Sequence, residues 1–140
     1  MISYTFTVLG RPEQKGSKRA LAHGAVVDAN PRAKHWQYVV EQTARDHWTP
    51  GMIDGPCAVS LEFYFQRPRY HYGTGRNREL IKTQFLDAQM TCTPDIDKLA
   101  RTVLDGLAGV VFTDDSRVVR LAVGKGYGDP QRCEVEVVVL

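Results

Sequence analysis

Four aspartates stand around one predicted helix and could together bind a divalent metal ion. Asp95 and Asp97 lie at the start of the helix, and Asp114 and Asp115 follow its end, just before a predicted strand. An aspartate at a helix cap and one in the first turn can both lie above the helix N-terminus, and an adjacent loop can add a third carboxylate. Clustered carboxylates without histidine or cysteine suit Mg²⁺ or Mn²⁺. Helix capping and an ordinary turn explain the same residues, so the spacing leaves both interpretations open.

A metal site of this kind suits phosphodiester hydrolysis. That reaction needs an activated water, neutralisation of the charge that develops on the phosphate and stabilisation of the leaving oxygen. Neighbouring carboxylates also repel one another when no metal is bound, which predicts a raised pKa in the group and stabilisation of the fold by metal.

The charges are sorted into blocks along the chain. Eighteen Lys and Arg against sixteen Asp and Glu give a net charge of only +2, too small to indicate a nucleic-acid partner by itself. Residues 11–35 and 66–82 each carry a net +4, whereas residues 87–115 carry a net −4. Cations in the two basic blocks are candidate phosphate contacts, with a solvated polar loop as the alternative for each: Arg11, Lys15, Lys18, Arg19, Arg67, Arg69, Arg76, Arg78 and Lys82. Tyr70 and Tyr72 could stack on unpaired bases.

Hydrophobic periodicity predicts six main elements that must position these residues. Alternating apolar residues predict strands, and apolar residues at the helical period predict helices. The expected order is β-α-β-α-β-β, over residues 2–9, 31–48, 57–66, 96–107, 117–124 and 132–140. We expect an α+β fold, a single domain over residues 1–140, with a four-stranded mixed sheet and two helices packed on one face.

The connections divide into loops and turns. Residues 10–29 and 67–93 show no sustained period and are expected to be long loops, which in small domains are often functional or mobile. Residues 126–130 indicate a hairpin-like turn between the last two strands. Trp36 and Trp48, at helical spacing, are expected in the core or at a dimer contact.

Composition excludes several classes of protein. Three widely spaced cysteines form neither a disulfide framework nor a metal-binding pair, which favours a reducing, cytoplasmic location. The four histidines have no ligand spacing. The N-terminus lacks a secretory signal pattern, and no apolar run is long enough to span a membrane, so no membrane association is expected.

The acidic run resembles a known family. Residues 93–107, TPDIDKLARTVLDGL, followed by residues 111–118, VFTDDSRV, resemble the signature of the RusA family of Holliday-junction resolvases. Residues 6–12, FTVLGRP, with Lys15 and Gly16, resemble phage-encoded members of that family.

The resemblance implies a homodimeric, Mg²⁺-dependent endodeoxyribonuclease, with Mn²⁺ as a second possible ion. Such an enzyme binds four-way junction DNA and nicks two strands symmetrically, in recombination and repair. The family's essential aspartates fall on Asp95, Asp97 and Asp115, and Asp114 matches a neighbouring acid. Two equivalent strands also call for a two-fold dimer with two equivalent sites.

One position departs from the family pattern. A family lysine falls on Arg101, and arginine stays protonated, so it can pair with a phosphate or with Asp97 but cannot act as a base. Lys98 is a candidate second cation for DNA binding. Two other hypotheses remain: a non-catalytic nucleic-acid-binding module of the same fold, and another metal-dependent nuclease that acts on flaps or RNA.

Overall fold

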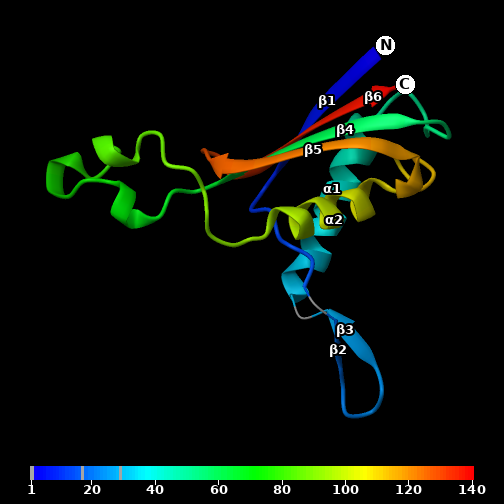
Figure 1. Ribbon diagram of the computed structural model, residues 1–140, viewed down its shortest axis with the longest axis horizontal. Helices are drawn as coiled ribbons and strands as arrows, with labels where there is room; N and C mark the ends of the chain where they lie inside the picture. The colour runs from blue at the N-terminus through cyan, green and yellow to red at the C-terminus, as the bar shows by residue number, and fades with distance from the viewer. Residues whose placement is uncertain (1, 17, 29) are drawn as a thin grey trace.

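A four-stranded mixed sheet carries the fold of the computed structural model, which describes residues 2–16, 18–28 and 30–140 (Figure 1). Its strands lie in the order β1-β6-β4-β5, with β1 at Ile2–Leu9, β4 at Cys57–Phe65, β5 at Val118–Tyr127 and β6 at Arg132–Val139. Strand β4 pairs in parallel with β5, and the other pairs are antiparallel. The sheet is therefore mixed, with β1 and β5 at its edges.

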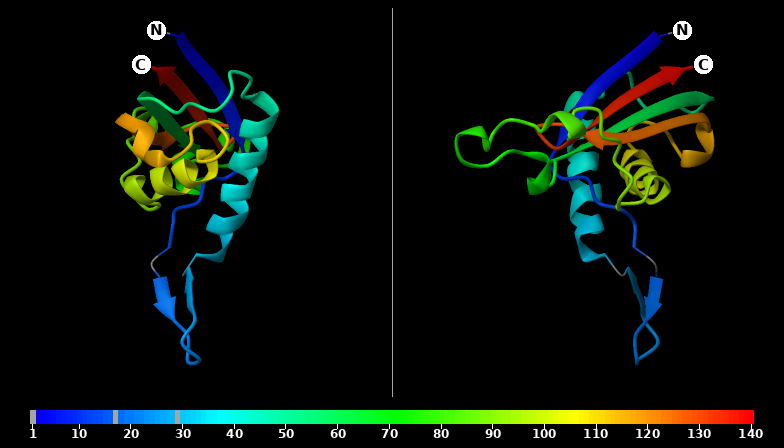
Figure 2. Two further views of the ribbon diagram at one scale, coloured as in Figure 1. Left: turned by 90° about the vertical axis from the view of Figure 1, so that its right-hand side faces the viewer. Right: turned by 60° about the vertical axis from the view of Figure 1, so that its left-hand side comes forward.

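Two helices cover one face of this sheet, as Figure 2 shows. Helix α1 spans Pro31–His47, and the side chain of its N-cap, Asn30, accepts a hydrogen bond from the Arg32 N–H. Helix α2 spans Ile96–Leu107. Alternate residues of β4 face the helices and are fully buried, from Cys57 to Phe65. The α+β class, the sheet and the one-sided helical layer match the prediction.

A glycine sets the distance between the two helices. A Cβ atom added to Gly106 would lie 2.9 Å from both the Gln37 carbonyl oxygen and the Val40 Cγ1 atom. Only a residue without a side chain permits this approach of α2 to α1. Trp36 and Trp48 are buried on the α1 side of the same core, as predicted.

Two connections differ from the expectation. Within the predicted loop 10–29, β2 (Lys18–Ala20) pairs with β3 (Val26–Asp28) as a separate hairpin, too short to show a periodic pattern. Strands β5 and β6 do not form a hairpin, because β4 lies between them. A turn pattern shows where the chain reverses but not which strand it pairs with next. No helix in the described residues has the length and apolar character to cross a membrane.

Residues 67–93 form a projection, called the arm here, at one end of the sheet (Figure 1). It contains three short 3₁₀ turns, at Arg69–His71, Gly75–Asn77 and Thr83–Phe85. The buried His71 ring stacks on Phe85 with 4.4 Å between ring centroids and meets the Tyr127 ring of β5 edge-on at 5.1 Å. The arm thus has an aromatic centre of its own that joins it to the sheet.

Substitution of Gly106 by alanine should test the close helix contact. Overpacking against α1 outweighs the gain in helix propensity, so we expect Gly106→Ala to lower the free energy of unfolding by about 1–2 kcal/mol. Gly126→Ala is the matched control, because its added Cβ would meet nothing within 4 Å. Urea unfolding followed by circular dichroism measures both. Equal stability of Gly106→Ala and the wild type would contradict this packing.

Candidate functional site

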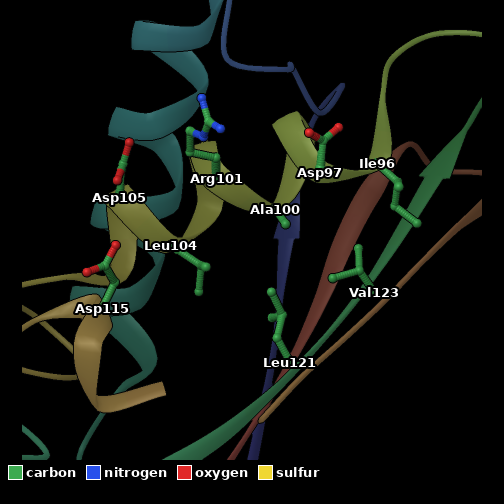
Figure 3. A pocket seen from close by; sticks show the side chains of 9 residues that line it. All are labelled: Ile96, Asp97, Ala100, Arg101, Leu104, Asp105, Asp115, Leu121 and Val123. Carbon is green, nitrogen blue, oxygen red and sulfur yellow. The ribbon is translucent and has the colours of Figure 1, made fainter. Parts of the chain in front are cut away.

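A groove of about 540 Å³ runs between α2 and the edge strand β5. Apolar side chains, including Leu104, Leu121 and Val123, form its floor. Its charged side chains come from α2 and from the turn before β5 (Figure 3), namely Asp97, Arg101, Asp105 and Asp115. The structure therefore brings two of the predicted catalytic aspartates, Asp97 and Asp115, to one groove.

The charged groups are spread along the groove. Asp97, Arg101 and Asp105 are each four residues apart, so they share one face of α2. At about 1.5 Å per residue, the backbone of Asp97 lies about 12 Å from that of Asp105 along the helix axis. Figure 3 shows Asp105 and Asp115 together at one end and Asp97 toward the other. The groove thus has two acidic ends with an arginine between them.

The turn before β5 places Asp114 and Asp115 in different environments. The Ser116 N–H donates a hydrogen bond of 2.9 Å to the Asp114 carboxylate, and this bond lowers the pKa of Asp114. The pKa of Asp115 is raised, first by the hydrogen bond it shares with Asp114, then by burial and by the charges of Asp114 and Asp105. Asp115 shows the raised pKa that crowded carboxylates predict.

Asp95 occupies the N-cap position of α2 but makes no side-chain capping bond. Its carboxylate lies 3.6 Å from the Lys98 ammonium, and its N–H donates to the Gln14 side-chain oxygen at 2.7 Å. It is not among the residues that line the groove. The convergence of Asp95, Asp97 and Asp115 on one point is absent from the described geometry.

The groove offers carboxylate oxygens, which are the type of ligand that a hard divalent cation prefers. In the described residues, however, no three Asp, Glu, His or Cys side chains come close enough to share one ion. The carboxylates of the groove are therefore divided between its two ends and form no complete ligand set within the described residues of one chain.

Asp105 is a groove residue that the sequence did not single out, and its contact with Lys15 was not expected. The Lys15 ammonium lies 3.0 Å from Asp105 and 3.1 Å from the Gln37 side-chain oxygen, and the Lys15 N–H donates to the Lys98 carbonyl at 3.1 Å. The spacing of Asp105 from Arg101 could have placed it on the same helix face. Its pairing with Lys15, ninety residues earlier in the chain, has no local signal.

Most of the predicted DNA-contacting cations also bind the protein itself. Arg101, Arg76 and Lys82 are exposed, and the side chains of Lys18 and Arg19 lie outside the described residues. The remaining cations are held by carboxylates or backbone carbonyls: Arg11 by Glu13, Lys15 by Asp105, Lys98 by Asp95, Arg67 by the Phe85 carbonyl, Arg69 by the Arg78 carbonyl and Arg78 by the Gly75 carbonyl. Phosphate binding by these residues remains a prediction.

The fold and the groove define a class, an α+β domain with a carboxylate-lined groove beside a sheet edge. The family model for endodeoxyribonuclease RusA matches residues 10–138, and the chain belongs to this family. It is also similar to the uncharacterized protein YqaN of Bacillus subtilis (strain 168), with 30% identity over 134 residues, which cover 94% of this chain and 93% of YqaN. Family membership confirms the resemblance and implies endodeoxyribonuclease activity.

Removal of either neighbouring carboxylate should lower the pKa of Asp115. We expect a larger fall in Asp114→Ala than in Asp105→Asn, because the bond with Asp114 is the main cause of the raised value. Asp115 would then lose its proton at a lower pH than in the wild type. Carboxyl-carbon NMR titration measures this, with Asp46→Asn on α1 as control. An unchanged Asp115 pKa in both variants would contradict the described geometry.

Proposed function

We propose that this protein is a divalent-metal-dependent endodeoxyribonuclease that resolves Holliday junctions by paired symmetric nicks, in DNA recombination and repair. The observation that carries the proposal is the placement of Asp97 and Asp115, from separate elements, in one groove within the segment that the family model matches.

The groove residues would have different roles in phosphodiester hydrolysis. Asp97 and Asp115 would hold the metal once a dimer brings the two ends of the groove together, and Asp95 and Asp114, which lie next to them in the sequence motif, are further candidate ligands. Mg²⁺ or Mn²⁺, when bound, would polarise the phosphate and lower the pKa of the attacking water. Arg101, exposed on the groove face of α2, neutralises phosphate charge and transfers no proton, since its guanidinium stays protonated. Water would lose a proton to solvent as it attacks phosphorus, and the bond to the leaving oxygen would break as that oxygen takes a proton from solvent.

A homodimer formed through β5 would bring the two acidic ends together. Strand β5 is an edge strand, and Val119 and Leu121 on it are 58% and 45% exposed. An unpaired edge with exposed apolar residues is a template for pairing with another chain. Antiparallel pairing of two β5 strands reverses their direction, so the Asp97 end of one groove would lie beside the Asp115 end of the other. This geometry supports a two-fold dimer with two equivalent sites.

The basic projections support junction binding. The β2–β3 hairpin and the arm extend from the sheet and helices in different directions (Figure 1), and both belong to the basic blocks of the sequence. Cations at two separated places can contact phosphates on either side of an acidic centre that would otherwise repel DNA. The separated carboxylates also suit the non-catalytic binding module, which would bind junctions without cutting them.

Cleavage of synthetic DNA substrates tests the proposed reaction. We expect the wild-type protein with Mg²⁺ to nick a four-way junction at symmetric positions in two strands, with much less cleavage of three-way and linear duplexes. Asp97→Asn and Asp115→Asn should each lower the rate by at least about 100-fold, because each removes a charged ligand. Asp46→Asn is the matched control on α1. Junction binding without Mg²⁺-dependent nicks, or full activity of Asp97→Asn, would reject the resolvase.

Charge on the β5 edge should disrupt the proposed dimer. Val119→Asp would place two like charges near the two-fold axis, so we expect at least a tenfold weaker dimer and slower cleavage. Met52→Asp, similarly exposed but in the loop before β4, should leave both unchanged. Light scattering after size-exclusion chromatography measures the mass at several concentrations. A monomeric wild-type protein at all concentrations would contradict the homodimer.

A further inference from the structure

A second polar pocket lies between the arm and the turn that follows β5. It has a volume of about 330 Å³, and its walls include Gln66, Arg67, Tyr72, Tyr127, Gly128 and Asp129. We propose that this pocket binds one unpaired nucleobase of the DNA, with a preference for guanine over adenine. The inference rests on the proposed function, because it names a part of the substrate that the groove does not contact.

The pocket lies at the end of the sheet where the two parallel strands finish, a position suited to ligand binding. Strands β4 and β5 run in parallel, and Phe65 pairs with Tyr127 in their last register position. Gln66 and Gly128 therefore follow the carboxyl ends of two neighbouring parallel strands, where open sheets commonly bind ligands.

The pocket also lies close to the groove. Val123 lines the groove and Tyr127 lines the pocket; at about 3.3 Å per residue, four residues along β5 separate them by about 13 Å. Between them, the Lys125 ammonium donates to the carbonyls of Cys92 and Pro94, at 2.6 and 2.8 Å, just before α2. Adjacent phosphates of one strand are about 3.4 Å apart along duplex DNA, so a base about four steps from a phosphate in the groove can reach the pocket.

Two tyrosines give the pocket stacking surfaces. Tyr72 and Tyr127 come from different segments, the arm and β5, and aromatic side chains stack on bases of any sequence. The guanidinium of Arg67 lies 5.4 Å from the centre of the Tyr127 ring and donates to the Phe85 carbonyl at 2.7 Å. Arg67 is therefore already oriented, and its guanidinium lies over one face of the Tyr127 ring, where its own planar face can stack on a base.

The polar residues account for the base preference. Asp129 offers only acceptors, whereas the Gln66 amide offers a donor and an acceptor. The pairing edge of guanine presents two neighbouring N–H groups to an acceptor, whereas adenine places a ring nitrogen lone pair there. In duplex DNA this edge is occupied by the opposite strand, so only an unpaired base can present it.

Contacts within the protein hold the walls of the pocket in place before a ligand binds. A Cβ atom on Gly128 would lie 2.8 Å from the Tyr64 ring, so the turn packs directly against β4. On the arm side, Tyr72 bridges to Ile81, and the Lys82 N–H donates to the His71 carbonyl at 2.8 Å. A preformed pocket loses less conformational entropy on binding than a flexible one.

Fluorescence anisotropy with labelled four-way junctions tests this pocket. One nucleotide at the exchange point is an unpaired guanine, an unpaired adenine or an abasic residue, and EDTA with about 50 mM salt prevents cleavage while it preserves electrostatic binding. We expect the wild-type protein to bind the guanine junction about 5- to 100-fold more tightly than the abasic junction, with adenine between them.

The variants separate stacking from edge recognition. Tyr72→Ala should abolish the advantage of guanine over the abasic residue, Tyr72→Phe should keep it, and Asp129→Asn should remove only the preference for guanine over adenine. Tyr38→Ala, which removes an exposed tyrosine of α1, is the matched control, and thermal melting verifies the fold of each variant.

Parallel cleavage of a fully paired junction with Mg²⁺ separates the two proposals. Equal affinity of the wild type for guanine and abasic junctions, with normal cleavage, overturns the base pocket alone. A retained guanine advantage without any Mg²⁺-dependent cleavage overturns the resolvase activity alone. Loss of the guanine advantage in the well-folded Tyr38→Ala variant also counts against the pocket.

Discussion

The position of α2 beside β5 is the constraint on which the candidate site depends. Three contacts fix the position of this helix. Gly106 packs against α1, and the Gln14 side chain accepts a hydrogen bond from the Asp95 N–H. Just before the helix, Lys125 donates to the carbonyls of Cys92 and Pro94. These contacts come from β5, α1 and the first loop, so the groove has a fixed width only when the whole domain is folded. A shift of α2 would alter the spacing between Asp97 on the helix and Asp115 on the turn.

Local patterns predicted the six main elements and the places of Asp97 and Asp115, in the first turn of α2 and after its end. Alternation in residues 57–65 and the Asn30–Pro31 start of α1 appear in the structure as expected, because neighbouring residues determine strand faces and helix caps. Asp97 and Asp115 belong to a motif whose residues lie close in the sequence. The contact of Lys15 with Asp105 and the insertion of β4 between β5 and β6 depend on distant segments, and no local pattern carries that information.

The net charge of the chain does not show where the candidate site lies, because several of its cations pair with carboxylates of the protein. Lys15 and Lys98 each pair with an aspartate of the acidic block, so part of the basic excess is neutralised inside the protein. Arg101 and Arg76 remain exposed. These pairs orient the carboxylates of Asp105 and Asp95, whereas the exposed arginines are the candidates for phosphate contacts. Cations that pair within the protein and cations that stay exposed count equally in the net charge, so the total does not distinguish them.

The separation of the two acidic ends of the groove is a reason to expect that a complete metal site needs two chains. Two-metal hydrolysis requires ions about 3.5–4 Å apart, whereas the two ends of the groove are separated by about 12 Å along α2. Asp97 and Asp115 lie toward different ends of the groove, and in the described residues no three Asp, Glu, His or Cys side chains come close enough to share one ion. In the proposed homodimer, a second chain paired along β5 would supply the missing end at each site, so the two-fold symmetry proposed for junction cutting would also complete the ligand set. In this arrangement an isolated protomer would bind DNA through its basic projections but lack a full catalytic centre.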